Sequence, residues 1–262
     1  MIPIGDSVRR RTFPYVNLSI IALSVLVFLY ELTLSTFPSA ILPGLGLASE
    51  LDLFLFDWGA QPACLGDAFG FDPDVPRRAL AALCPDSDRV ALTPFTSVFI
   101  HGGWIHLIGN MIFLWVFGDN VEDAMGHLRY AVFYLVAGMA ATAAHVAVNQ
   151  NDLTPAVGAS GAIAGVLGAY LVLYPRATIA AILPVLLLFW IPFYVPAAFL
   201  IGFWFLLQLF NGVAALATTD VVGAGGIAWF AHIGGFVAGL LLVHLFVLGR
   251  RRPPALRAAD GR

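Results

Sequence analysis

Six apolar runs constrain the fold of this chain more than any other feature. They cover residues 16–32, 130–148, 160–174, 195–211 and 228–248, and one more begins near Trp104. A helix of about 20 mostly apolar residues is long enough to cross the hydrocarbon core of a bilayer. Only 11% of the 262 residues are charged, whereas a soluble domain carries about 25%. We therefore expect an all-α, polytopic membrane protein with a bundle of six transmembrane helices.

The runs are expected to form one membrane domain over residues 1–262. Residues 33–100 are expected to form a long loop on the outer side, and they carry eight of the 16 acidic residues. Within this loop, residues 51–58 are too apolar for a linker and too short to span a bilayer, so we interpret them as an interfacial segment. Residues 250–262 are expected to be a short cytoplasmic tail.

The first apolar run has two interpretations. A basic start at Arg9, Arg10 and Arg11 followed by a short apolar core also fits a signal peptide. We favour a retained first helix because the run extends through Phe28 and Tyr30, and no A-x-A cleavage site follows closely.

The segment 179–192 decides the number of spans. Residues 179–211 are almost wholly apolar but contain three prolines in their first half. They form either two spans, or a re-entrant or interfacial segment (179–192) followed by one helix. With six spans and the N-terminus inside, ten of the 13 arginines lie inside, whereas a seventh span would place Arg250–Arg252 outside. Basic residues favour the cytoplasmic side, so we expect six spans, both termini in the cytoplasm and no crossing by 179–192.

Two polar side chains at the starts of apolar runs are candidates for a catalytic site. Ser160 lies between Gly158 and Gly161, and His232 precedes Gly234 and Gly235. Glycines of this kind allow close helix packing, but they also permit a turn that exposes a nucleophilic hydroxyl. Ionisable groups within a membrane are costly and are functional candidates. The chain has no lysine, which leaves histidine as the base for a serine.

The expected topology places both side chains at a similar depth near the outer surface. The fourth and sixth helices descend from Ser160 and His232, respectively, and small residues line one face of each helix. Neither helix carries a carboxylate, so we expect a Ser–His dyad in place of a triad.

Four groups are expected to stabilise a developing oxyanion. His106 and Asn110 are four residues apart and share one helix face, although they could instead satisfy each other or neighbouring backbone. The backbone N–H groups of Ser160 and Gly161 are the other two. The loss of one such donor costs about 3 kcal/mol of transition-state stabilisation.

The chain has two cysteines, Cys64 and Cys84, and both lie in the long outer loop. Thiols on the outer side of a membrane can be oxidised. We therefore treat a Cys64–Cys84 disulfide as a hypothesis.

Together these motifs resemble the rhomboid intramembrane serine proteases, and bacterial members in particular. The resemblance covers about residues 92–245 and rests on these patterns: His101-Gly-Gly-Trp-x-His106-x-x-x-Asn110, Gly118-Asp-Asn-Val-Glu-Asp123, Gly158-x-Ser160-Gly161 and Ala231-His232-x-x-Gly235.

The resemblance implies a Ser160–His232 dyad with His106 and Asn110 in the oxyanion site. It also implies cleavage of transmembrane substrates near the outer membrane face, with residues 195–226 as a gate, and it favours a bacterial inner membrane. One departure is Ala164, because some members carry an aromatic residue there that stacks on the histidine. The outer loop also lacks the Trp-Arg pair of some bacterial members.

Other functions fit the sequence less well. A membrane metalloprotease would need a motif such as His-Glu-x-x-His, which is absent from the sequence. A transporter would show internal repeats or broken helices around a midplane site. A catalytically weak rhomboid-like module for membrane-protein binding or quality control is the alternative. The expected partners are transmembrane protein substrates and the lipid bilayer, with no cofactor, metal or nucleic acid.

Overall fold

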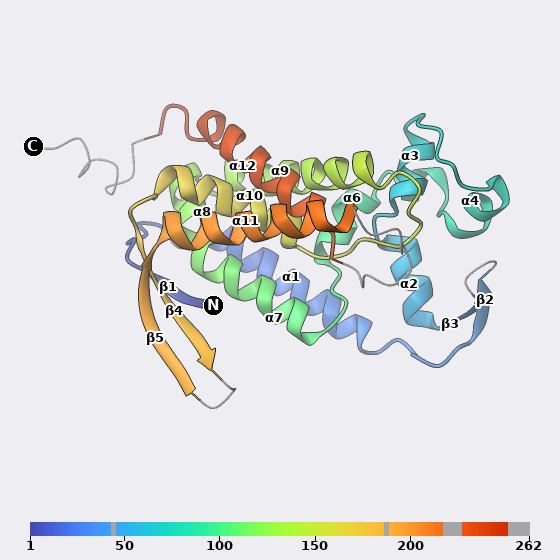
Figure 1. Cartoon of the computed structure of the whole chain (residues 1–262), viewed down its shortest axis with the longest axis horizontal. Helices are drawn as coiled ribbons and strands as arrows, with labels where there is room; N and C mark the ends of the chain where they lie inside the picture. The colour runs from blue at the N-terminus through green and yellow to red at the C-terminus, as the bar shows by residue number, and fades with distance from the viewer. Residues whose placement is uncertain (43–45, 186–188, 217–226, 251–262) are drawn as a thin grey trace, which may run out of the picture.

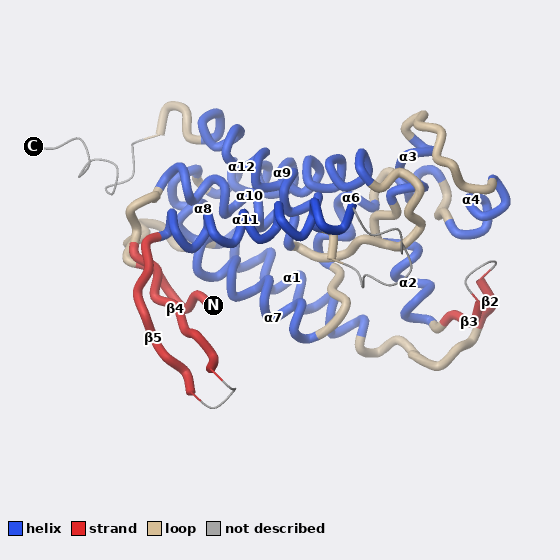
Figure 2. The backbone as a smooth tube through the Cα atoms, in the orientation of Figure 1, coloured by secondary structure: helices blue, strands red, loops and turns tan. Residues whose placement is uncertain are grey.

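The computed structural model describes residues 1–262 except 43–45, 186–188, 217–226 and 251–262. Long helices run side by side along the longest axis of the molecule (Figure 1). A small sheet lies at one end of this bundle, and short helices of the outer loop lie at the other (Figure 2). The expectation of an all-α protein with six spans is confirmed in its coarser form: the protein is mostly helical, and three or four candidate membrane spans lie among the described residues.

The bundle helices agree closely with the apolar runs. They are α1 (Tyr15–Glu31), α7 (Trp104–Phe113), α8 (Asp119–Met125), α9 (His127–Val148), α10 (Ser160–Leu173), α11 (Ala197–Leu216) and α12 (Trp229–Phe246). A π-helical turn, Leu114–Gly118, joins α7 to α8. Among the described residues, α9, α11 and α12 are long and apolar enough to cross a membrane, and the bent pair Ser87–Phe99 and Trp104–Met125 passes the same test as a unit. The other two helices, α1 and α10, are apolar but shorter.

Helix α10 lies at the centre of the bundle. Eleven of its 14 residues are buried, and most of them are small. Gly165 is so close to Ala137 of α9 that an added Cβ would lie 2.5 Å from the Cβ of Ala137. On the α12 side, an added Cβ at Gly168 would meet the carbonyl oxygen of Phe236. Small residues thus bring three helix backbones together, as they do in membrane helix pairs generally.

The all-α prediction is wrong for residues 178–196. They form an antiparallel hairpin of β4 (Thr178–Val185) and β5 (Phe189–Pro196), and β1 (Ile2–Asp6) pairs with the outer edge of β4. The hairpin lies at one end of the bundle (Figure 2). The segment 179–192, for which the sequence predicts a re-entrant or interfacial position without strands, thus lies within this hairpin.

Proline accounts for this conformation. It removes a backbone donor and breaks helices, and in sheets it is tolerated on edge strands. Pro192 and Pro196 lie in the edge strand β5. Pro184 lies in β4 beyond Ile182, the last residue of that strand that pairs with β1.

The sequence also misplaced the turn after the second helix. In the sequence, the polar residues Glu122 and Asp123 suggest a short turn, but both are buried in α8, and the chain turns at Gly126, where φ is 82°. Glu122 accepts hydrogen bonds from two backbone N–H groups at the start of α1, at 3.0 and 2.7 Å. Asp123 accepts from the N–H and hydroxyl of Thr12, at 2.9 and 2.7 Å. These bonds satisfy the buried carboxylates and fix the N-terminal segment to the bundle.

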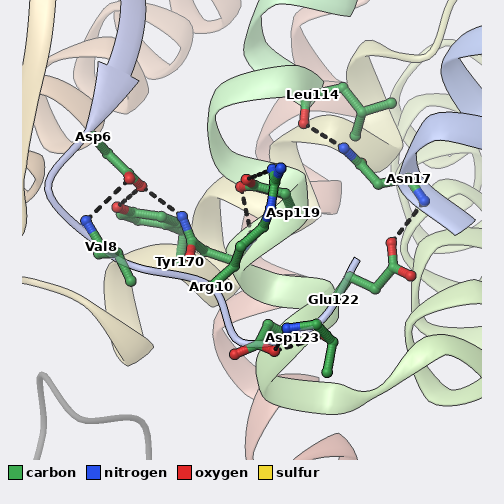
Figure 3. Close-up of polar contacts among 11 residues, drawn as sticks. Asp6, Val8, Arg10, Asn17, Leu114, Asp119, Glu122, Asp123 and Tyr170 are labelled. Carbon is green, nitrogen blue, oxygen red and sulfur yellow. Dashed lines mark hydrogen bonds and ion pairs between the residues drawn. The ribbon is translucent and has the colours of Figure 1, made fainter. Parts of the chain in front are cut away.

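Asp6 extends this polar network at the end of β1. Its carboxylate accepts hydrogen bonds from the Tyr170 hydroxyl, the Asn120 amide at 2.9 Å and the Val8 N–H at 3.1 Å (Figure 3). Burial raises the pKa of Asp6 to about 6. The first strand is therefore held by a group that titrates near neutral pH.

The outer loop is folded. It contains β2 (Ala40–Leu42), β3 (Gly46–Ala48), α2 (Glu50–Trp58), α3 (Pro62–Ala68), α4 (Arg77–Leu83), α5 (Ser87–Val90), α6 (Thr93–Thr96) and the 3-10 turn η1 (Ser97–Phe99). The segment expected to be interfacial, 51–58, is helix α2, which begins with a capping box between Ser49 and Asp52. A disulfide joins Cys64 of α3 to Cys84 at the end of α4.

Candidate active site

Ser160 and His232 are hydrogen-bonded. Ser160 is the first residue of α10, and His232 lies in the first turn of α12. The distance from His232 Nε2 to Ser160 Oγ is 2.8 Å. The structure thus brings together the two side chains that the sequence singled out.

Glycine packing makes this distance possible. A Cβ on Gly235 of α12 would collide with the carbonyl oxygen of Gly161 on α10. One turn further along, a Cβ on Gly239 would collide with the carbonyl oxygen of Gly165. The two helices approach backbone to backbone, which allows a short serine side chain on one to reach a histidine on the other.

Gly158 shapes the approach to Ser160. Its φ is 123°, a conformation that favours glycine. A Cβ at this position would lie 2.6 Å from Cε1 of His106. The N–H of Gly158 donates to the carbonyl oxygen of Ser97 at 2.8 Å. This residue therefore needs to be glycine both for its backbone conformation and for its contact with the His106 ring.

The four expected oxyanion donors are two side chains of α7 and two backbone N–H groups at the start of α10. Asn110 is 8% exposed, and its Nδ2 has no hydrogen-bond partner among the described residues. In the part of the chain that the structure describes, His106 and Asn110 form no hydrogen bond with each other; the His106 ring instead packs edge-on against the ring of His101. The N–H groups of Ser160 and Gly161 belong to the first turn of α10, where no residue of the same helix can accept from them.

An open cavity of about 810 Å³ adjoins Ser160 and His232. His106, Asn110, Ser160 and His232 line it together with Trp204 of α11. The remaining lining residues are Gly102, Gly103, Trp104, Ile105, Gly109, Phe113, Val157, Ile163, Leu167, Ile227 and Ala228. A cavity of this size, mostly apolar with a few convergent polar groups, is typical of a ligand-binding or active site.

Sequence reasoning missed one partner of the histidine. The Nδ1 atom of His232 lies 2.8 Å from Oε1 of Gln208, which α11 carries. Gln208 interrupts an otherwise apolar stretch of that helix, and a buried amide in such a stretch needs a partner. Two carboxylates lie in the stretches of sequence that precede α10 and α12. Asp152 accepts a hydrogen bond from the N–H of Thr154 in its own turn, and Asp220 lies outside the described residues.

A family model described as "Rhomboid domain" matches residues 89–249 of the chain.

Individual relatives are more distant. "RHOMBOID-like protein 1" of Arabidopsis thaliana is 29% identical over 154 residues, which cover 59% of this chain and 34% of that protein. "Rhomboid-like protease 5" of Toxoplasma gondii is 31% identical over 148 residues, or 55% of this chain and 15% of that protein. "Rhomboid protein 1, mitochondrial" of Saccharomyces cerevisiae is 31% identical over 153 residues, with coverages of 55% and 39%. The chain spans less than half the length of these relatives.

Proposed function

The chain belongs to the rhomboid family, and on that premise we propose that it is an intramembrane serine endopeptidase that cleaves transmembrane proteins near the outer membrane face. The observation that carries the proposal is the 2.8 Å hydrogen bond between Ser160 Oγ and His232 Nε2, inside a cavity that also contains His106 and Asn110. A serine hydroxyl is a weak nucleophile at neutral pH. It needs an adjacent general base to attack a peptide bond, and His232 is in the position of that base.

In the proposed reaction, Ser160 Oγ attacks the carbonyl carbon of the scissile peptide bond. Its proton passes to Nε2 of His232, and the carbonyl oxygen becomes an oxyanion. His232 then gives that proton to the leaving amine as the C–N bond breaks, which leaves an acyl ester on Ser160. A water molecule, with His232 again as the base, hydrolyses the ester and regenerates the hydroxyl.

We assign the oxyanion to the four donors around Ser160. The unpartnered Nδ2 of Asn110 supports this role, because a buried amide without a partner is costly unless a ligand uses it. The His106 imidazole and the backbone N–H groups of Ser160 and Gly161 are the other donors. Donors fixed by the fold before substrate binds need no reorganisation when the charge develops.

The proposed topology has six spans: α1, the bent α7–α8 unit, α9, α10, α11 and α12. The protein is an integral membrane protein, and we place both of its termini in the cytoplasm and the protein in a bacterial inner membrane. The arginine distribution supports this orientation. A hairpin at β4–β5 in place of another span keeps the starts of α10 and α12 at one level.

We propose that substrates reach the site beside α11. Trp204 of this helix lines the cavity, and Phe199, Phe203 and Phe210 of the same helix are exposed. Exposed aromatic residues on a membrane helix face lipid or another helix. The loop half of the expected gate, residues 217–226, lies outside the described residues.

The test is covalent labelling by a fluorophosphonate probe, combined with cleavage of a transmembrane reporter in proteoliposomes. We expect wild type to be labelled and to cleave, Ser160→Ala to lose both activities, and His232→Ala to be labelled far more slowly. Ser19→Ala is the matched control, because Ser19 bonds only its own helix backbone. Labelling that is equal in wild type and Ser160→Ala, without cleavage, would instead support the binding or quality-control module.

A further inference from the structure

We propose that Gln208 is the positioning residue for His232, so that the working unit is Ser160–His232–Gln208. This inference rests on the proposed function. It adds a third, uncharged member from α11 to a site whose two expected residues lie on α10 and α12.

The orientation of the Gln208 amide is determined by its other contact. Its Nε2 donates to the backbone carbonyl of Trp204, one turn earlier in α11, at 3.1 Å. A carbonyl oxygen can only accept, so the NH₂ group must face Trp204 and Oε1 must face His232. Gln208 is only 6% exposed, so water competes little for either contact.

The amide in turn determines the tautomer of His232. Because Oε1 can only accept, Nδ1 must carry the proton of the neutral imidazole. Nε2 is then unprotonated and presents its lone pair to the Ser160 hydroxyl 2.8 Å away. With the other tautomer, Nε2 would donate to Ser160 and could not serve as a base.

Two tryptophans pack around the imidazole ring of His232. The ring centroids of Trp204 and His232 are 5.9 Å apart, and those of Trp229 and His232 are 6.2 Å apart with the planes perpendicular. On the α10 side, position 164 is a buried alanine. The imidazole thus contacts Gln208 and Trp204 of α11 and Trp229 of its own helix, and no aromatic residue at position 164 on the helix of the serine.

The amide also has a role during the reaction. When Nε2 takes the serine proton, the imidazolium carries N–H groups on both nitrogens, and Nδ1–H continues to donate to Oε1 of Gln208. No proton moves to Gln208. A neutral amide stabilises this cation less than a carboxylate would, because a carboxylate would add the attraction between two opposite charges.

Three variants test the inference by cleavage of the reporter in proteoliposomes. Gln208→Met keeps the length of the side chain but removes the acceptor, and we expect kcat to fall roughly 10- to 100-fold with KM unchanged. Gln208→Glu restores an acceptor, and we expect its kcat to recover to within about tenfold of wild type. Gln150→Met, the same substitution in the turn after α9 and outside both the cavity and the gate, is the control and should match wild type. A Gln208→Met enzyme with wild-type kcat would overturn the inference.

A spectroscopic test needs neither activity nor a variant at 208. The chain has six histidines, and nitrogen-15 NMR of the histidine-labelled protein, assigned with His232→Ala, reports which ring nitrogen carries the proton. We expect His232 to be protonated at Nδ1. Protonation at Nε2 would overturn the role of Gln208 even in an active protease. Conversely, a wild-type protein that is neither labelled nor active but has His232 protonated at Nδ1 would overturn the proposed function and leave the geometry intact.

Discussion

The carbonyl oxygen of Gly161 occupies the space in which a side chain at Gly235 would begin. This contact sets the separation of α10 and α12, and with it the distance between Ser160 and His232. Helices in a membrane associate mainly through close packing. The catalytic geometry that we propose is therefore fixed by residues that take no part in the chemistry.

We predict that Gly235→Ala separates α10 from α12. The added methyl has no space, and overpacking of this kind costs about 1–3 kcal/mol. Both the unfolding temperature in detergent and the rate of fluorophosphonate labelling should fall. Gly202→Ala is the control, because nothing lies within 4 Å of a Cβ added there. Unchanged labelling in Gly235→Ala would show that the helices can adjust without loss of the site.

Replacement of Asn110 tests the oxyanion site. Asn110→Leu removes a buried donor of similar size, and we expect kcat to fall about 10²- to 10³-fold, or about 3–4 kcal/mol. KM should change little, because the donor acts on charge that develops only in the transition state. Gln150→Leu, in the turn after α9, is the matched amide control. A variant that raised only KM would indicate that Asn110 binds the substrate in its ground state.

Removal of the Cys64–Cys84 disulfide should destabilise the outer loop. The bridge closes a loop with a sequence separation of 20, for which chain entropy predicts about 3 kcal/mol. The double variant Cys64→Ser, Cys84→Ser should be cut by an added protease between α3 and α4 sooner than wild type. Equal rates of cutting with and without reductant in the wild-type protein would contradict this prediction.

The attachment of β1 should weaken as pH rises. The pKa of Asp6 is raised from 3.8 to about 6, so the folded state binds more protons than the unfolded state between these values. This contribution to stability is fully present below pH 3.8 and is lost as pH rises through about 6. Hydrogen-exchange protection factors for Ile2–Asp6 should be lower at pH 7.5 than at pH 5.

Asp6→Asn should remove this pH dependence, because the amide does not titrate. Its single oxygen can still accept from the Tyr170 hydroxyl and the Asn120 amide, while the hydrogen bond from the Val8 N–H, which uses the other carboxylate oxygen, is lost. Asp88→Asn, at an exposed site of the outer loop, should leave the dependence in place. If protection of β1 at pH 7.5 equals that at pH 5 in the wild-type protein, then Asp6 does not control the attachment of the strand.

The apolar runs predicted the helices of the bundle well, because a membrane helix needs a long, uninterrupted stretch with few charges. The expected run 228–248 became Trp229–Phe246, and the expected start of the second helix near Trp104 is correct. Errors occurred where polar residues are buried. Glu122 and Asp123 resemble a turn in the sequence, but the N-terminal segment, more than 100 residues away, satisfies them inside a helix.

The prolines in the apolar stretch 178–196 predict its structure only in part. They exclude a regular helix, but they do not distinguish a re-entrant loop from a hairpin. The pairing of Ile182 with Pro192 on one side and with Ile2 on the other depends on the N-terminus reaching this end of the bundle. No local pattern contains that information.

In the candidate site, we identified Ser160, His232, His106 and Asn110 from the sequence. These side chains belong to recognisable motifs, and they are polar groups in apolar segments, where burial of a polar group is costly. Gln208 is also a polar residue in an apolar helix, but it belongs to no motif, so it is a weaker indication of a functional residue. Its partner lies 24 residues further along the chain. The sequence does not show how α11 is rotated, and that rotation decides whether Gln208 faces lipid or the imidazole.

Because Gln208 lies on α11, the opening of a substrate path beside this helix is linked to the orientation of the proposed base, His232. Any displacement of α11 that opens a lateral path also withdraws the acceptor from Nδ1 of His232. A polypeptide admitted through such an opening would meet an imidazole free to rotate, and the serine would stay unreactive until α11 returned. Docking and scission would then be successive events, and a segment that prevents the return of α11 would be held without being cut.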